Sequence, residues 1–236
     1  MRNILIIILF LGYHSLFSQS AEDYFKSGWV KYKSNNYYGA IADYTKAIEL
    51  KPLFIGAFHD RACAKYKLND FSGALIDFMQ VYNMNSNYKL SYNVLGDCKY
   101  QLNDFYGALN YFNKAIEINS YDDMAYYNRG NTKKELKDYL GALSDFNIAI
   151  EINPKNEDAY NNRGTTKEKL QDYRGAIEDY TKVIEINPKH EIAYFNRGCA
   201  KLHISITNKN GACLDWSKAG ELGYVEAYEM IRQYCN

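Results

Sequence analysis

Residues 138–149 read DYLGALSDFNIA, and variants of this stretch recur along the chain. The other copies read NYYGAIADYTKA at 36–47, DFSGALIDFMQV at 70–81, DFYGALNYFNKA at 104–115 and DYRGAIEDYTKV at 172–183. Each copy begins 34 residues after the one before it. An internal repeat of this length is typical of proteins built as a stack of small, similar units.

Two further residue types follow the same period. All three prolines fall on one phase of it, and five glycines fall on another, with an alanine in the remaining place. These residues are Pro52, Pro154 and Pro188, and Gly28, Ala62, Gly96, Gly130, Gly164 and Gly198. The period is therefore fixed independently of the Gly-Ala dipeptide in the quoted stretch.

Each unit is predicted to be two amphipathic helices joined by a turn. With Ala21 counted as position 1, aromatic residues recur at positions 4, 17 and 24, and apolar positions lie three and four apart in two blocks. A short polar residue at position 16 predicts the N-cap of the second helix. These residues are Asn36, Asp70, Asp104, Asp138 and Asp172. One such hairpin cannot bury its apolar face alone, so the units must stack.

This pattern resembles the tetratricopeptide repeat (TPR), with an aromatic residue at position 4, a small residue at 8, Ala at 20, an aromatic residue at 24, Ala at 27 and Pro at 32. The resemblance covers residues 21 to about 222 and implies an all-α fold, a right-handed α-solenoid of six helix-turn-helix units. The units are 21–54, 55–88, 89–122, 123–156, 157–190 and 191–222.

The end of the chain departs from the repeat. The sixth unit carries two extra residues between His203 and Asn210. From Trp216 to Gly223 the sequence resembles the end of a Sel-type repeat, a relative of the TPR. Terminal units need an atypical closing element because their outer face meets water. We therefore expect residues 223–236 to form a capping helix.

The first twenty residues also lie outside the repeat. Arg2 precedes an unbroken apolar run, Ile4–Leu11, and a small and polar segment follows. This order predicts a secretory signal peptide, residues 1–20, cleaved before Gln19 or Ala21. The run is far shorter than the roughly 20 apolar residues of a membrane-spanning helix, which makes a permanent anchor the weaker alternative. We expect an exported protein, periplasmic or associated with the cell envelope, without stable membrane insertion after cleavage.

Five cysteines follow this segment, and an odd number cannot all pair. No Cys-x-x-Cys motif is present, so neither a dithiol redox site nor a zinc ribbon is indicated. Export would permit a disulfide, and Cys213 with Cys235 is the preferred pair.

The sequence predicts neither catalysis nor a cofactor. His59, His190 and His203 lie at unrelated phases of the repeat and predict no cluster. Motifs for zinc, nucleotide phosphates, dinucleotides and a nucleophilic serine do not occur. With 28 basic and 28 acidic residues, the net charge of zero gives no field that attracts nucleic acid. We expect a non-enzymatic protein without metal or cofactor.

Arginines at position 7 occur together with an acid. Units that have the arginine also have an aspartate sixteen residues later, or eighteen across the insertion, whereas the third unit has Leu95 and Tyr111 instead. The predicted pairs are Arg61 with Asp77, Arg129 with Asp145, Arg163 with Asp179, and Arg197 with Asp215. Because every unit that has the arginine also has the aspartate, we expect structural ion pairs between the two helices of one unit.

The TPR resemblance also implies a binding surface. In TPR stacks the first helices line the concave face, and asparagine at position 6 is similar to the series that holds extended peptides. Here the series is Asn128, Asn162 and Asn196. An amide donates and accepts, so it can pair with any peptide group. The alternative is that these amides face water or bridge neighbouring units. Further expected groove residues are Tyr127, Asn131, Asn161, Thr165 and Phe195, with Trp29 and Tyr32 in a more aromatic N-terminal half.

The sequence thus predicts a scaffold whose concave face binds an extended peptide or a partner's helix. One alternative is a structural component of a cell-envelope assembly complex, which an exposed apolar or aromatic patch at either end of the stack would favour. Another is an enzyme or ligand-binding accessory in carbohydrate handling, for which Trp29 and Tyr32 clustered on an open groove would be the sign. The partner's identity and the oligomeric state stay open.

Overall fold

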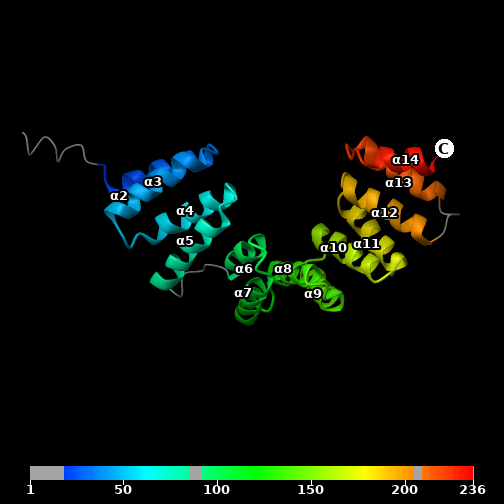
Figure 1. The fold of residues 1–236 in the computed structure, drawn as a ribbon, viewed down its shortest axis with the longest axis horizontal. Helices are drawn as coiled ribbons and strands as arrows, with labels where there is room; N and C mark the ends of the chain where they lie inside the picture. The colour runs from blue at the N-terminus through cyan, green and yellow to red at the C-terminus, as the bar shows by residue number, and fades with distance from the viewer. Residues whose placement is uncertain (1–18, 86–91, 205–208, 236) are drawn as a thin grey trace, which may run out of the picture. The chain divides into compact units, whose positions relative to one another are not determined.

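The computed structural model describes residues 19–85, 92–204 and 209–235, and within these ranges the secondary structure is helical, with no strand (Figure 1). The helices are α2 (Ala21–Lys33), α3 (Tyr37–Leu50), α4 (Ile55–Lys67), α5 (Phe71–Met84), α6 (Tyr92–Gln101), α7 (Phe105–Ile118), α8 (Asp123–Glu135), α9 (Tyr139–Ile152), α10 (Glu157–Lys169), α11 (Tyr173–Ile186), α12 (Glu191–Ile204), α13 (Lys209–Glu221) and α14 (Ala227–Tyr234). The predicted all-α repeat fold is confirmed. Residues 1–18 of the predicted signal peptide lie outside the described residues.

The chain divides into two compact parts, residues 1–102 and 103–236. In the first part the helices α2 to α6 pack successively against one another, and in the second the helices α7 to α14 do the same (Figure 1). Within each part, a first helix that lies between two second helices, such as α4, α8, α10 or α12, contacts both of them, as a stack of repeats requires. No helix in the described ranges is long and apolar enough to span a membrane.

The core of the regular units is built around an aromatic ring that lies on a helix backbone. The rings at position 24 and the alanines at position 20 are almost completely buried; they are Tyr44, Phe78, Phe112, Phe146, Tyr180 and Trp216, and Ala40, Ala74, Ala108, Ala142, Ala176 and Ala212. A Cβ added to Gly130 would lie 2.8 Å from Phe146 Cε1, closer than packed atoms approach. Glycine at position 8 is therefore what lets the ring rest on the first helix.

The position-16 side chains cap the second helices, as predicted. Asp138 Oδ1 accepts a hydrogen bond from the Gly141 amide at 3.0 Å, and the same bond recurs at the start of α3, α5, α7 and α11. A Cβ on Gly141 would overlap the Asp138 carboxylate. The glycine of the recurring Gly-Ala dipeptide thus makes room for the cap.

A residue in the left-handed conformation precedes each of these caps and fixes the turn. Its φ is 61° at Asn35 and 63° at Lys137, and Asn69, Asn103 and Gln171 adopt the same conformation. Asparagine adopts this conformation more readily than most side chains, because its short polar group can bond locally. Three of the five turns use it.

A disulfide closes the C-terminal end of the chain. It joins Cys213 on α13 to Cys235, which directly follows α14, so the preferred pair is present. The helix α14 lies within the segment expected to form a cap and packs against α13. There the Trp216 ring is fully buried, with the Tyr234 ring centre 5.8 Å away.

Candidate functional site

Each predicted arginine contacts the predicted aspartate of its own unit. Arg129 Nε and Nη2 donate to the two carboxylate oxygens of Asp145 at 2.9 and 2.6 Å. The same geometry joins Arg61 to Asp77, Arg163 to Asp179 and Arg197 to Asp215. The aspartates are buried, and the arginines keep only a small exposed fraction. A bidentate pair in this setting holds two helices together and leaves the carboxylate little capacity to bind a ligand.

A lysine at position 11 completes each pair, a contact that sequence reasoning did not assign. Lys133 Nζ lies 2.7 Å from Asp145 Oδ2. Lys65, Lys167 and Lys201 contact the aspartates of their own units in the same way. The sequence contained a sign of this contact, because all six units carry lysine at position 11. The recurring lysine did not by itself indicate an ion pair, since lysine on a helix is usually solvent-exposed.

The arginines also link neighbouring units. Arg129 Nη1 donates to Asn113 Oδ1 on α7 at 2.8 Å. Arg163 reaches Asn147 in the same way, and Arg61 and Arg197 reach the hydroxyls of Thr45 and Thr181. Each arginine therefore joins three helices. In the first unit, Ser27 and Lys31 bind Asp43 in its place, and in the third unit Leu95 is buried at this position.

Four predicted or neighbouring groove residues form a hydrogen-bonded network between α8 and α10. Asn162 Nδ2 donates to Tyr127 Oη and to Asn131 Oδ1, both at 3.0 Å, and its Oδ1 accepts from Lys134 Nζ at 3.4 Å. We call Tyr127, Asn131, Lys134 and Asn162 the amide network. Burial raises the pKa of Tyr127 and lowers the pKa of Lys134. Asn162 thus bridges two units and has both amide hydrogens in use.

A second link of this kind joins α10 to α12. Asn196 Nδ2 donates to Asn161 Oδ1 at 3.4 Å. Asn128 differs, because within the described ranges no hydrogen bond to its side chain is present; its carbonyl accepts from Thr132 Oγ1 at 2.8 Å. The three position-6 asparagines are therefore not equivalent: two bridge neighbouring units, and Asn128 keeps its amide for other partners.

The other two predicted groove residues in this half also make internal contacts. Thr165 Oγ1 donates to the carbonyl oxygen of Asn162 at 3.0 Å. The Phe195 ring centre lies 4.8 Å from that of Tyr224, and the Phe195 carbonyl accepts from Trp216 Nε1. Phe195 is thereby part of the packing at the C-terminal end.

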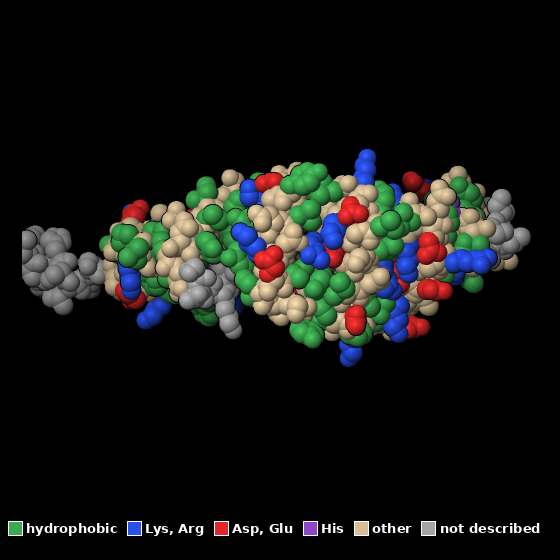
Figure 2. Space-filling view, turned by 90° about the horizontal axis from the view of Figure 1, so that it is seen from below, with side chains coloured by type: hydrophobic (Ala, Val, Ile, Leu, Met, Phe, Trp, Pro, Cys, Tyr) green, Lys and Arg blue, Asp and Glu red, His purple; other side chains and the backbone are tan. Residues whose placement is uncertain are grey.

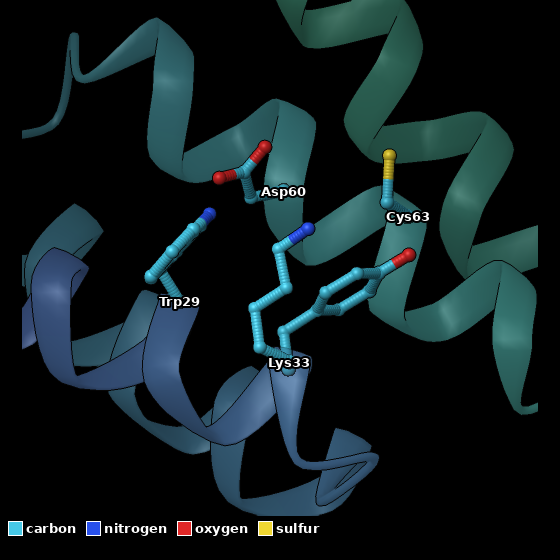
Figure 3. A pocket seen from close by; sticks show the side chains of 5 residues that line it. Trp29, Lys33, Asp60 and Cys63 are labelled. Atoms are coloured by element: carbon cyan, nitrogen blue, oxygen red, sulfur yellow. The ribbon is translucent and has the colours of Figure 1, made fainter.

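The N-terminal half contains a small pocket, shown in Figure 3. Trp29, Tyr32 and Lys33 from α2 line a cavity of about 120 Å³ together with Asp60 and Cys63 from α4. Trp29 is 50% exposed. Lys33 Nζ lies 5.5 Å from the centre of a Trp29 ring, so a cation covers one face of the indole. Trp29 and Tyr32 do cluster, as carbohydrate binding requires, but one indole face is already occupied.

Beside this pocket, His59 contacts two side chains of its own helix. His59 Nδ1 lies 2.9 Å from Asp60 Oδ1 and 4.0 Å from Cys63 Sγ. These contacts of His59 were not assigned from the sequence, in which the histidines were considered only as a group. The spacing of His59 and Cys63, four residues apart on one helix, was the available signal. Among the described residues, no group of three or more histidine, cysteine, aspartate or glutamate side chains is arranged so that it could hold a metal ion.

Charged side chains form no single-sign field on the face shown in Figure 2. Lys and Arg alternate there with Asp and Glu, and hydrophobic side chains lie between them. This distribution agrees with the net charge of zero. A phosphate backbone needs a continuous basic surface, so this face is unsuited to nucleic acid.

Comparisons with known proteins identify the repeat. A tetratricopeptide repeat family profile matches residues 21–52, 90–122 and 125–156, and a second tetratricopeptide repeat profile matches residues 157–190. Together these segments cover more than half of the chain. The comparison with curated proteins gave no match.

Solved structures show the same fold. YrrB, described as a TPR protein with an unusual peptide-binding site, is 25% identical, with a TM-score of 0.60 over 74% of this chain and 90% of its own. The C-terminal part of a TPR repeat-containing protein from Cytophaga hutchinsonii is 20% identical, with a TM-score of 0.72 over 89% and 87%. A tetratricopeptide repeat protein from Parabacteroides merdae is 18% identical, with a TM-score of 0.69 over 93% and 100%. With its 34-residue helix pairs and their ring-on-glycine cores, the chain belongs to the tetratricopeptide repeat family.

Proposed function

We propose that the chain is a non-catalytic scaffold that binds an extended peptide or a partner's helix across the first helices of its units. The observation that carries the proposal is the row of amide side chains on α8, α10 and α12. The amide network joins the first two of these helices, and the Asn161–Asn196 bond joins the last two. Amide groups thus recur from helix to helix at the repeat spacing, which suits the regular peptide groups of an extended chain.

The existing hydrogen bonds decide which amides are able to hold a ligand. Asn162 has both donors in use, so its contribution is to position its neighbours. The Asn161 amino group, the Asn196 carbonyl and the complete Asn128 amide take no part in the bonds described above. An amide has two donors and one acceptor oxygen, so these three residues retain the capacity to pair with peptide groups. We therefore assign peptide contact to Asn128, Asn161 and Asn196, and a supporting role to Asn162.

The likeness to YrrB supports a peptide as the ligand. That protein has a peptide-binding site by its description, and it is the relative named above with the highest sequence identity, 25%. The scaffold role also fits the family matches, which are all to repeats and include no enzyme family. Export to the periplasm or cell envelope, indicated by the N-terminal sequence, is part of the proposal, and it would supply the partners.

A second candidate function is a structural role in a cell-envelope assembly. The observation that favours it is an exposed apolar and aromatic pair at the C-terminal end, Val225 at 71% and Tyr228 at 50% exposed. Side chains of this kind at the end of a stack suit permanent contact with another subunit.

The test is panning of a displayed random-peptide library against residues 19–236. The triple variant Asn128→Ala, Asn161→Ala and Asn196→Ala is compared with the parent, after circular dichroism has shown that both are folded. The control carries Tyr38→Ser and Tyr106→Ser, two side chains that are 78% exposed and belong to second helices rather than to the first-helix row. We expect the selected peptides to bind the parent and the control equally well. Their affinity for the triple variant should be at least ten-fold lower.

The same experiment separates the two candidates. Equal binding of the selected peptides to the parent and the triple variant contradicts the groove. A variant with Val225→Ser and Tyr228→Ser tests the assembly role. If that variant alone loses the captured ligands, the C-terminal end is the binding surface and the scaffold proposal fails in its present form.

A further inference from the structure

The three free cysteines lie in different surroundings. Cys98 is completely buried, and burial raises its pKa to about 12. Burial also raises the pKa of Cys199 to about 11. A thiol that is buried and neutral is a poor nucleophile, because the thiolate is the reacting form. Cys63 is partly exposed, as Cys199 also is, and it differs from both other thiols in lining the N-terminal pocket.

The helix α4 places a cation beside the Cys63 sulfur. Asp60 Oδ1 lies 2.9 Å from His59 Nδ1, and His59 Nδ1 lies 4.0 Å from Cys63 Sγ. The bond to Asp60 is the main reason why the pKa of His59 is raised to about 10, so the imidazole is protonated at neutral pH. A protonated imidazole next to a thiol favours the thiolate. Neither Cys98 nor Cys199 has a histidine among its described partners.

The pocket gives a small reactant access to this sulfur. Figure 3 shows Trp29 and Lys33 extending from α2 toward α4, which carries Asp60 and Cys63. The cavity of about 120 Å³ suits one end of a small molecule rather than a folded partner. His59 is paired with Asp60 and also faces the Cys63 sulfur, so Lys33 is the pocket-lining cation that is left to meet the charge of a reactant. An anionic reactant is therefore favoured over a cationic one.

We propose that Cys63 is a thiol–disulfide exchange site for small disulfides that carry carboxylates. The Cys63 thiolate attacks one sulfur of the disulfide RS–SR, and a Cys63–S–SR bond forms as the RS–SR bond breaks. The leaving RS⁻ takes up the proton that the Cys63 thiol released, so the products are the mixed disulfide and RSH. No further oxidant is needed. The inference does not depend on the proposed function, because it concerns the pocket between α2 and α4 and not the amide row on α8, α10 and α12.

The first experiment measures which thiol reacts. Residues 19–236, natively folded, are mixed with 5,5′-dithiobis(2-nitrobenzoate), an anionic aromatic disulfide, and modified peptides are located by mass spectrometry after successive times. We expect modification of Cys63 at least ten times faster than of Cys98 or Cys199, and loss of the fast phase in Cys63→Ser. A fast phase that persists in Cys63→Ser, or equal rates at the three thiols, overturns the proposal.

The second experiment tests His59 as a positioning residue through the pH profile of the rate. The titratable and charged groups around Cys63 are His59 and Asp60 on its own helix, Tyr32 and Lys33 from α2, Tyr44 from α3 and Cys98 from α6. His59→Asn removes the cation and keeps the size of the side chain. We expect the rate at pH 7 to fall about ten-fold and to recover at high pH, a change that a merely structural role would not produce. An unchanged profile overturns the role of His59.

The third experiment tests the preference for anions. The rate with 5,5′-dithiobis(2-nitrobenzoate) is compared with that of cystamine, a cationic disulfide, in the parent and in Lys33→Gln. Cys63 is the thiol observed in all cases. We expect the ratio of the two rates to fall several-fold in Lys33→Gln. If the ratio stays the same, charge at the pocket does not select the reactant, and the assignment to anionic disulfides is wrong.

Discussion

Arg129 and Asp145 face each other across the two helices of one unit, joined by parallel hydrogen bonds of 2.9 and 2.6 Å. Asp145 is 1% exposed and also binds Lys133, so its carboxylate offsets two positive charges. Pairs of this kind recur in four units. These contacts hold the two helices of a unit together, and the arginine also bonds to a side chain of the unit before it.

Removing the carboxylate should therefore destabilise the chain strongly. Asp145→Ala leaves Arg129 and Lys133 without their shared partner, and breaking a buried pair from one side costs about 3–5 kcal/mol. Urea unfolding followed by circular dichroism measures the loss. The double variant Arg129→Leu and Asp145→Tyr copies the residues of the third unit and should lose less. If the double variant is as unstable as the single one, packing and not the unpaired charges explains the effect.

Two glycines on first helices should respond oppositely to alanine. In Gly130→Ala the new Cβ would lie 2.8 Å from Phe146, so the buried ring must move, at a cost of about 1–3 kcal/mol. In Gly56→Ala the nearest atom is 3.5 Å away, an ordinary contact, and the higher helix propensity of alanine should stabilise by about 0.5 kcal/mol. Thermal unfolding of the two variants tests the comparison, and a stabilised Gly130→Ala would show that the ring has room to shift.

Contacts within one unit could be predicted from the sequence because the period fixes them. Phe146 in the core, the Asp138 cap and the Arg129–Asp145 pair all depend on spacing along one hairpin, which is the same in every copy. The third unit supplied the contrast for the arginine, since Leu95 replaces it where the acid is also missing. Lysine at position 11 has no such contrast and was not recognised.

Contacts between units were harder to predict. The bond from Asn162 to Tyr127 depends on how far one helix is shifted along its neighbour, and the period does not fix that offset. The sequence left open whether the asparagines bind a ligand or bridge units, and in the structure Asn162 bridges. The contact of His59 with Cys63 was missed because it occurs in one unit alone and a search for repeated features does not detect it.

Reducing the disulfide should weaken the C-terminal end. Cys213 and Cys235 are 22 residues apart, and closing a loop of that length stabilises by about 3 kcal/mol in the chain-entropy description. The chain has two tryptophans, so Trp29→Phe leaves the buried Trp216 as the fluorescent reporter of this end. We expect reductant to lower the urea midpoint of that signal. A Cys213→Ser and Cys235→Ser variant should start at the lower midpoint and be insensitive to reductant.

The start of the chain should affect the stability of α2. Ser20 Oγ accepts from the Asp23 amide at 3.1 Å, and Asp23 Oδ2 accepts from the Ser20 amide at 3.0 Å, which forms a reciprocal cap. A chain that begins at Gln19 keeps this cap, and one that begins at Ala21 loses it. We expect the longer chain to unfold at a higher temperature and to protect the α2 amides better in hydrogen exchange. Equal protection would show that packing against α3 alone holds α2.

The His59–Asp60 bond should give the folded state a definite pH dependence. The pKa of His59 is raised to about 10 in the folded chain, against about 6.5 for an unperturbed histidine. The folded state therefore binds the proton more tightly than the unfolded one. The contribution of protonated His59 to the stability of the folded state is present in full below about pH 6.5 and is lost as the pH rises to about 10. In Asp60→Asn the pKa of His59 should return toward its ordinary value, and this contribution should disappear.

Denaturant unfolding of the parent and Asp60→Asn at pH 6 and pH 10 tests this, with an NMR titration of the histidines as a direct check. The two chains should differ in stability at pH 6 and converge at pH 10, and a difference that is constant across this range would place the effect of Asp60 elsewhere than on His59.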